Sequence, residues 1–130
     1  TTCQRPWLKG FDKSLTTNLS PTTDAMNIIT VQELQCFRDQ GVDHQLIDVR
    51  ESYEVEVSNL GGLHIPMADL KSRTDDIRTD VPVVIHCRSG ARSAAVTHAL
   101  SQQLGFDNVH NLEGGIRAWA DKIDPNMDVA

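Results

Sequence analysis

The segment Val83-Val-Ile-His-Cys-Arg-Ser-Gly-Ala-Arg-Ser93 carries the strongest structural signal in the sequence. Residues 81–86 form an apolar, β-branched run, which is typical of a strand buried on both faces of a parallel sheet. A turn over 87–92 follows, and Gly90 suits a tight turn there. Apolar residues then recur at every fourth position from 96 to 104, which predicts a helix over 93–104. Strand, loop and helix in this order indicate an α/β protein.

Strands and helices alternate along the rest of the chain. The clearest helix start is Thr30-Val-Gln-Glu33, a capping box in which the Thr hydroxyl and the Glu carboxylate bind free amides. We expect further strands at 28–29, 45–50, 63–66 and 108–112, and further helices at 30–40, 51–57, 68–77 and 116–123. The alternation predicts a small parallel sheet flanked by helices on both faces.

The 130 residues are enough for one domain of ordinary size. Residues 1–27 contain six Thr and little apolar periodicity, so we expect a linker or flexible arm there and the domain at 28–130. The net charge of -6 disfavours nucleic acid and membrane surfaces as partners. No apolar run is long enough for a membrane span.

The three cysteines, Cys3, Cys36 and Cys87, include no CxxC pair. This sparse, odd set does not suggest a disulfide framework or a zinc site. We therefore expect no bound metal, no cofactor and a cytoplasmic location.

Cys87 is expected at the carboxyl end of the buried strand, the edge where open α/β sheets bind ligands. The loop amides, the N-terminus of the next helix, Arg88 and Arg92 all favour a negative charge there. Such surroundings lower the pKa of a thiol and activate it as a nucleophile. A lone Cys after a buried strand is more often a core residue, but a core Cys needs no cationic loop.

Four ordered segments resemble rhodaneses. The loop Cys87-Arg-Ser-Gly-Ala-Arg92 resembles their six-residue active-site loop. The segments Leu46-Ile-Asp-Val-Arg-Glu51, Asn59-Leu-Gly-Gly-Leu-His-Ile-Pro66 and Asn111-Leu-Glu-Gly-Gly-Ile-Arg-Ala-Trp119 resemble three further family motifs. The resemblance runs from about residue 28 to residue 125. The C-terminal stretch also resembles the rhodanese module of adenylyltransferases that activate ubiquitin-like sulfur carriers for molybdopterin or thiamine synthesis.

The resemblance implies a sulfurtransferase that carries sulfur as a persulfide on Cys87. Arg88 and Arg92 would attract an anionic donor such as thiosulfate, or a protein persulfide would serve. The backbone amides from Ser89 through Gly90, Ala91 and Arg92 to Ser93 would cradle the persulfide. Asp48 and Arg50 would form a structural or rim pair near the site, and 113–119 would mainly define the fold.

The implied acceptors are a thiol, cyanide or a sulfur-carrier protein, and an adenylyltransferase domain could lie upstream. Two other readings stay open: a Cys-dependent phosphatase or arsenate reductase on the same fold, and a non-catalytic interaction module. Cys-dependent phosphatases place five residues between Cys and Arg, whereas four separate Cys87 from Arg92. The shorter loop fits a sulfur atom better than a tetrahedral phosphate.

Overall fold

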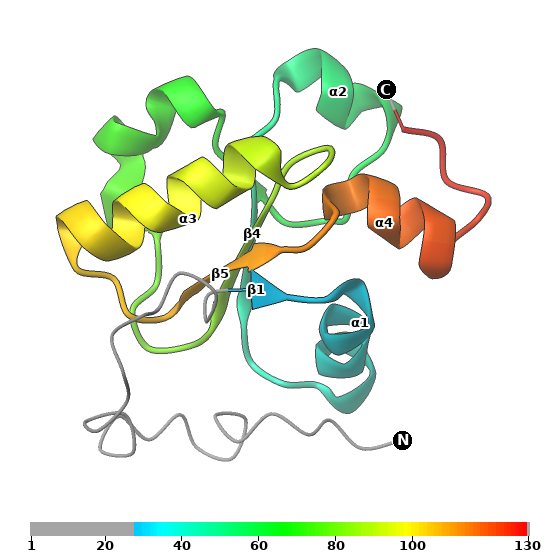
Figure 1. Ribbon diagram of the computed structural model, residues 1–130, viewed down its shortest axis with the longest axis horizontal. Coiled ribbons are helices and arrows are strands. Elements are labelled where there is room, and N and C mark those ends of the chain that lie inside the picture. Colours follow the sequence, from blue (N-terminus) through cyan, green and yellow to red (C-terminus); the bar gives the residue numbers. More distant parts are fainter. Residues whose placement is uncertain (1–27, 130) are drawn as a thin grey trace.

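The computed structural model describes residues 28–129 and contains a five-stranded parallel sheet in the order β1-β5-β4-β2-β3 (Figure 1). The strands are β1 (Ile28–Ile29), β2 (Gln45–Asp48), β3 (Leu63–His64), β4 (Val83–His86) and β5 (Val109–Leu112). The helices are α1 (Val31–Gln40), α2 (Ser52–Val57), α3 (Ala91–Leu104), α4 (Gly115–Lys122) and the 3-10 segment η4 (Met67–Asp76). The predicted α/β class and parallel sheet are confirmed.

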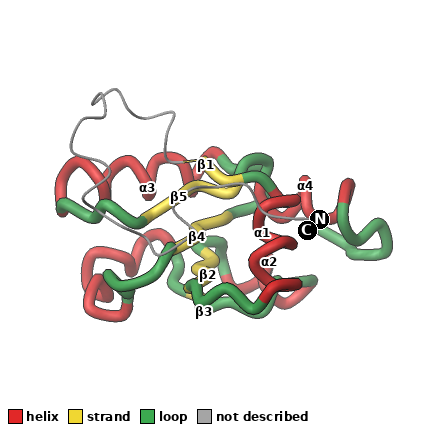
Figure 2. Tube along the Cα trace, turned by 90° about the horizontal axis from the view of Figure 1, so that it is seen from below, coloured by secondary structure: helices red, strands yellow, loops and turns green. Residues whose placement is uncertain are grey.

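Helices cover both faces of the sheet (Figure 2). Strand side chains alternate between the faces, so each face carries its own apolar cluster. On one face Ile47 and Ile85 pack with Val96 and Leu100 of α3 and with η4. On the other face, Leu46 and Val84 pack with side chains of α1 and α4. The central strand β4 is buried along its whole length.

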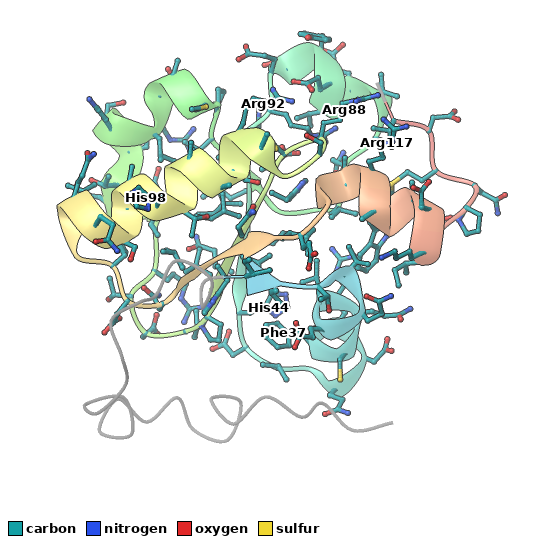
Figure 3. All side chains as sticks on the ribbon, in the orientation of Figure 1. Phe37, His44, Arg88, Arg92, His98 and Arg117 are labelled. Atoms are coloured by element: carbon teal, nitrogen blue, oxygen red, sulfur yellow. The ribbon has the colours of Figure 1, made fainter. Side chains whose placement is uncertain are left out.

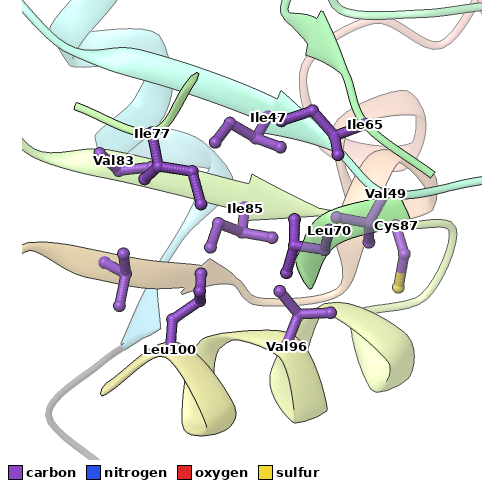
Figure 4. Close-up of a cluster of buried hydrophobic side chains, with 11 residues drawn as sticks. Ile47, Val49, Ile65, Leu70, Ile77, Val83, Ile85, Cys87, Val96 and Leu100 are labelled. Atoms are coloured by element: carbon purple, nitrogen blue, oxygen red, sulfur yellow. The ribbon is translucent and has the colours of Figure 1, made fainter. Parts of the chain in front are cut away.

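Cys87 belongs to the cluster under α3 and lies at its end, beside the loop that leads into this helix (Figure 4). The core therefore holds the cysteine directly against the N-terminus of α3. Cys87 is therefore both a core residue and a neighbour of the helix start, where a functional site is expected.

Most predicted elements are present, with shifted ends. The capping box at Thr30 and Glu33 forms as expected. The helix after the loop begins at Ala91 and not at Ser93, because Gly90 ends the loop with a positive φ of 100° and α3 starts directly after it. The helix expected at 68–77 is present as a 3-10 segment over 67–76, with a kink at Arg73.

The arm predicted at 1–27 lies outside the described residues. Among the described helices, none combines the length and the apolar character needed to cross a membrane.

Candidate active site

Cys87 follows the last residue of β4 and carries a free thiol that is fully buried. Both the strand and α3 fix its position, since the loop between them spans only a few residues. Its sulfur accepts hydrogen bonds from the amide of Gly90 at 3.1 Å and from the amide of Ser93 at 3.4 Å. The Ser93 hydroxyl lies 3.4 Å from the same sulfur. These donors, together with the amide of Ser89, converge on one sulfur at the start of a helix.

These donors change the acidity of the thiol. Burial alone raises the pKa of Cys87, because it removes water from the thiolate. Hydrogen bonds from the Ser93 hydroxyl and from the amides of Ser93, Gly90 and Ser89 outweigh this effect and hold the pKa below its ordinary value. The site therefore favours the thiolate, which is the nucleophilic form of cysteine.

The N-terminus of α4 orients the first part of the loop. The amide of Ile116 donates to the carbonyl of Cys87, and the amide of Arg117 donates to the carbonyl of Arg88, both at 3.0 Å. In a trans peptide the N–H points opposite to the carbonyl. The amides of Arg88 and Ser89 therefore point away from α4, and the Ser89 amide bonds the sulfur of Cys87.

Gly115 makes this contact between α4 and the loop feasible. A Cβ at this position would lie 2.5 Å from the carbonyl oxygens of both Cys87 and Arg88. Its φ of +62° is also strained for other residues. The segment 113–119, expected mainly to define the fold, thus also shapes the loop after Cys87.

Asn111 was not predicted as a site residue, yet it supports the loop from β5. Its Oδ1 accepts a hydrogen bond from the Ser93 hydroxyl at 2.5 Å, and its Nδ2 donates to the carbonyl of Gly90 at 3.3 Å. Ser93 has one hydroxyl proton to share between Asn111 and the sulfur. One feature of the sequence could have indicated Asn111: it lies near the carboxyl end of a predicted strand, and this strand pairs with the strand that precedes Cys87.

The two loop arginines have different surroundings. Figure 3 shows Arg88 and Arg92 near the N-terminal end of α3, with Arg117 of α4 on the same side. Arg92 binds the carboxylate of Glu54 through two hydrogen bonds of 2.8 Å. This pairing lowers the pKa of Glu54 to about 2 and raises the pKa of Arg92. Glu54, on α2, was missed because its partner lies 38 residues away.

Asp48 and Arg50 form a buried ion pair at 2.8 Å, with side chains 3% and 0% exposed. They therefore do not line an exposed rim. Arg50 also donates to the carbonyls of Glu54 and Ser58, near the two ends of α2. Burial raises the pKa of Asp48, but hydrogen bonds from Arg50 and the proximity of His86 outweigh it and lower the value. The pair thus fixes α2, and with it Glu54, against the sheet.

Comparison with known proteins identifies relatives of several kinds. The family model described as the rhodanese-like domain matches residues 30–122. The chain is 43% identical over 79 residues to a protein of Allochromatium vinosum named sulfurtransferase, covering 60% of this chain and 73% of that protein. It is 42% identical over 80 residues to the uncharacterized protein YqhL of Bacillus subtilis, covering 61% of this chain and 63% of YqhL.

A longer match is to the adenylyltransferase and sulfurtransferase MOCS3 of Aedes aegypti. It is 32% identical over 132 residues, covering 94% of this chain but 30% of that protein. The chain thus spans less than two thirds of YqhL and less than one third of the mosquito protein.

The fold is similar to that of solved rhodanese-like domains. A rhodanese-like domain protein from Staphylococcus aureus superposes with a TM-score of 0.68 at 28% identity, covering 81% of this chain and 99% of that one. The family match covers more than half of the chain, and the structural likeness agrees with it. The chain therefore belongs to the rhodanese-like domain family.

Proposed function

We propose that this protein is a sulfurtransferase in which Cys87 carries sulfur as a persulfide. The observation that carries the proposal is the buried thiol whose sulfur receives hydrogen bonds from Gly90 and Ser93 at the start of α3. Membership of the rhodanese-like family and the relatives named sulfurtransferase support the same activity.

The chemistry follows two steps. The Cys87 thiolate attacks the outer sulfur of the donor, a new S–S bond forms, and the donor's own bond to that sulfur breaks. With thiosulfate the leaving group is sulfite, which takes the bonding electron pair. An acceptor nucleophile then attacks the outer sulfur of the persulfide and releases the Cys87 thiolate, so that cyanide becomes thiocyanate. This is covalent, two-step catalysis.

The loop suits the intermediate because a persulfide is again an anion. The loop amides that bind the Cys87 sulfur, from Ser89, Gly90 and Ser93, would also bind the persulfide, and α3 places its positive end at the same point. The same hydrogen bonds thus serve the thiolate and the persulfide in turn.

The donor is thiosulfate or a persulfide, and the acceptor is a thiol, cyanide or a sulfur-carrier protein. The adenylyltransferase and sulfurtransferase relative supports an adenylyltransferase domain in the same protein. The location we propose is the cytoplasm.

Intact-protein mass spectrometry tests the proposal. The chain is incubated with thiosulfate beside Cys87→Ser, which keeps a small polar side chain but cannot form a persulfide. A gain of one sulfur atom on the native chain only, removed by cyanide, is the expected result. No gain with thiosulfate or with cysteine persulfide would refute it, and hydrolysis of p-nitrophenyl phosphate in that case would favour the phosphatase alternative.

A further inference from the structure

Arg92 is one of the two loop arginines expected to attract thiosulfate, and the carboxylate of Glu54 already binds it. Its Nη1 binds Oε2 of Glu54 and its Nη2 binds Oε1, so both terminal nitrogens of the fork are engaged. Glu54 is held in turn, because its Oε2 accepts a hydrogen bond from the Glu51 amide at 2.9 Å. The Glu54 carboxylate is thus held by the guanidinium of Arg92 and by the backbone of Glu51.

Burial makes Glu54 difficult to displace. Its side chain is 6% exposed, whereas that of Arg92 is 36% exposed. An incoming anion that competes for the guanidinium would leave the Glu54 carboxylate buried and unpaired, and such a charge is strongly unfavourable. Arg92 therefore contributes little net positive charge to a donor.

The surroundings of the pair also favour an organic donor. Tyr53 and Val57 flank Glu54 on α2 and are 68% and 49% exposed. Tyr53 lies near enough to Arg92 to affect its pKa. Exposed apolar side chains beside a site suit a carbon-bearing ligand better than a small inorganic dianion.

We infer that Glu54 is a specificity-determining residue that makes an organic persulfide, and not thiosulfate, the preferred sulfur donor. The inference rests on the proposed function. The charge of thiosulfate lies partly on its sulfonate oxygens, which need a cation, and Glu54 already neutralises Arg92. An organic persulfide carries a carbon group in place of the sulfonate and does not need that cation.

The transfer balances without another reactant. The Cys87 thiolate attacks the outer sulfur of R–S–SH, and an S–S bond to Cys87 forms as the donor's S–S bond breaks. The inner sulfur leaves as R–S⁻ with the bonding pair. The proton stays on the new persulfide of Cys87 or passes to solvent.

The test compares cysteine persulfide, whose amino-acid end has no net charge, with thiosulfate as donors for the intact chain. The measured quantity is kcat/KM for the formation of the Cys87 persulfide (charging), which mass spectrometry monitors. Glu54→Gln keeps the size of the side chain and removes its charge. Glu56→Gln is the matched control, because Glu56 is an exposed carboxylate on the same helix.

We expect the native chain to have a higher KM for thiosulfate than for cysteine persulfide. Glu54→Gln should raise kcat/KM for thiosulfate by about tenfold relative to that for cysteine persulfide, since one negative charge near a dianion is removed. Glu56→Gln should leave this ratio unchanged. A cysteine persulfide within a longer peptide, tested in parallel, distinguishes a protein donor from a small molecule. If the peptide charges Cys87 faster than free cysteine persulfide does, and Tyr53→Ala slows this charging, the donor is a protein. Equal rates for the two persulfides indicate a small-molecule donor.

An unchanged ratio in Glu54→Gln would overturn the inference while leaving the sulfurtransferase intact. If Glu54→Gln does not fold, the native chain decides alone, because a lower KM for thiosulfate than for cysteine persulfide is incompatible with the inference. Failure of both donors to charge the native chain would instead refute the proposed function.

Discussion

The hydroxyl of Ser93 is expected to set much of the acidity of Cys87. Ser93→Ala removes a donor 3.4 Å from the sulfur and leaves the amide of residue 93 in place. A hydrogen bond to a charged group contributes about 1.5–3 kcal/mol, and each pKa unit corresponds to about 1.4 kcal/mol. The hydroxyl also donates to Asn111, so the lower end applies. We therefore expect the variant to disfavour the thiolate by about 1.5 kcal/mol, so that the pKa of Cys87 rises.

The sign of this change fixes the shape of the pH profile. Below both pKa values the variant has about one tenth of the native thiolate fraction. Single-turnover charging of Cys87 should therefore be about tenfold slower at low pH, and the two rates should converge once both thiols are ionised. Thiolate absorbance and mass spectrometry across a pH series measure the two quantities independently.

Ser101→Ala is the matched control, because Ser101 lies on α3 about two turns after Ser93 and is not among the hydrogen-bond donors described for Cys87. A pKa of Cys87 that stays at its native value in Ser93→Ala would refute the argument, since it would place the hydroxyl proton wholly on Asn111. An equal loss of rate at every pH would point to lost positioning instead of lost acidity.

Two further predictions concern stability. The pKa of Glu54 falls from 4.5 to about 2 on folding, so its ionised form stabilises the fold above about pH 4.5, and this stabilisation is lost as the pH falls toward 2. The difference in unfolding free energy between the native chain and Glu54→Gln, measured with urea, should therefore shrink by up to about 3 kcal/mol over that range. A difference that does not depend on pH would contradict this prediction. Gly115→Ala should destabilise the fold by about 2–4 kcal/mol and slow charging of Cys87, because the new Cβ would meet the carbonyls of Cys87 and Arg88 at 2.5 Å. The control Gly41→Ala has a similar φ of +67° with nothing within 4 Å, so thermal unfolding should show a cost of only about 1–2 kcal/mol, and equal costs would show that strain alone acts.

The sequence predicted the fold class and the position of Cys87 because both depend on local patterns. The apolar run before Cys87, the glycine of the loop and the capping box at Thr30 are each confined to a few residues. Element ends were less predictable. The first turn of α3 includes Ala91 and Arg92, which carry no apolar periodicity, so the pattern placed the start of the helix two residues late.

The parts of the site that could not be predicted depend on tertiary contacts. Nothing near Glu54 in the sequence indicates that it meets Arg92, because the contact needs α2 and α3 to pack at one edge of the sheet. The Asn111 side chain likewise reaches Ser93 only when β5 lies beside β4. The adjacent Asp48 and Arg50 were recognisable as a pair, but their burial followed only from the packed structure.

The two hydrogen bonds from α4 to the loop carbonyls link the lifetime of the active loop to local unfolding of the C-terminal helix. Whenever the first turn of α4 opens, the amides of Ile116 and Arg117 release the carbonyls of Cys87 and Arg88. Amide hydrogen exchange at those two residues therefore reports how often the loop after Cys87 loses its shape. A ligand or partner that holds α4 closed, without contacting Cys87, would raise exchange protection there and lengthen the time for which a loaded sulfur remains bound.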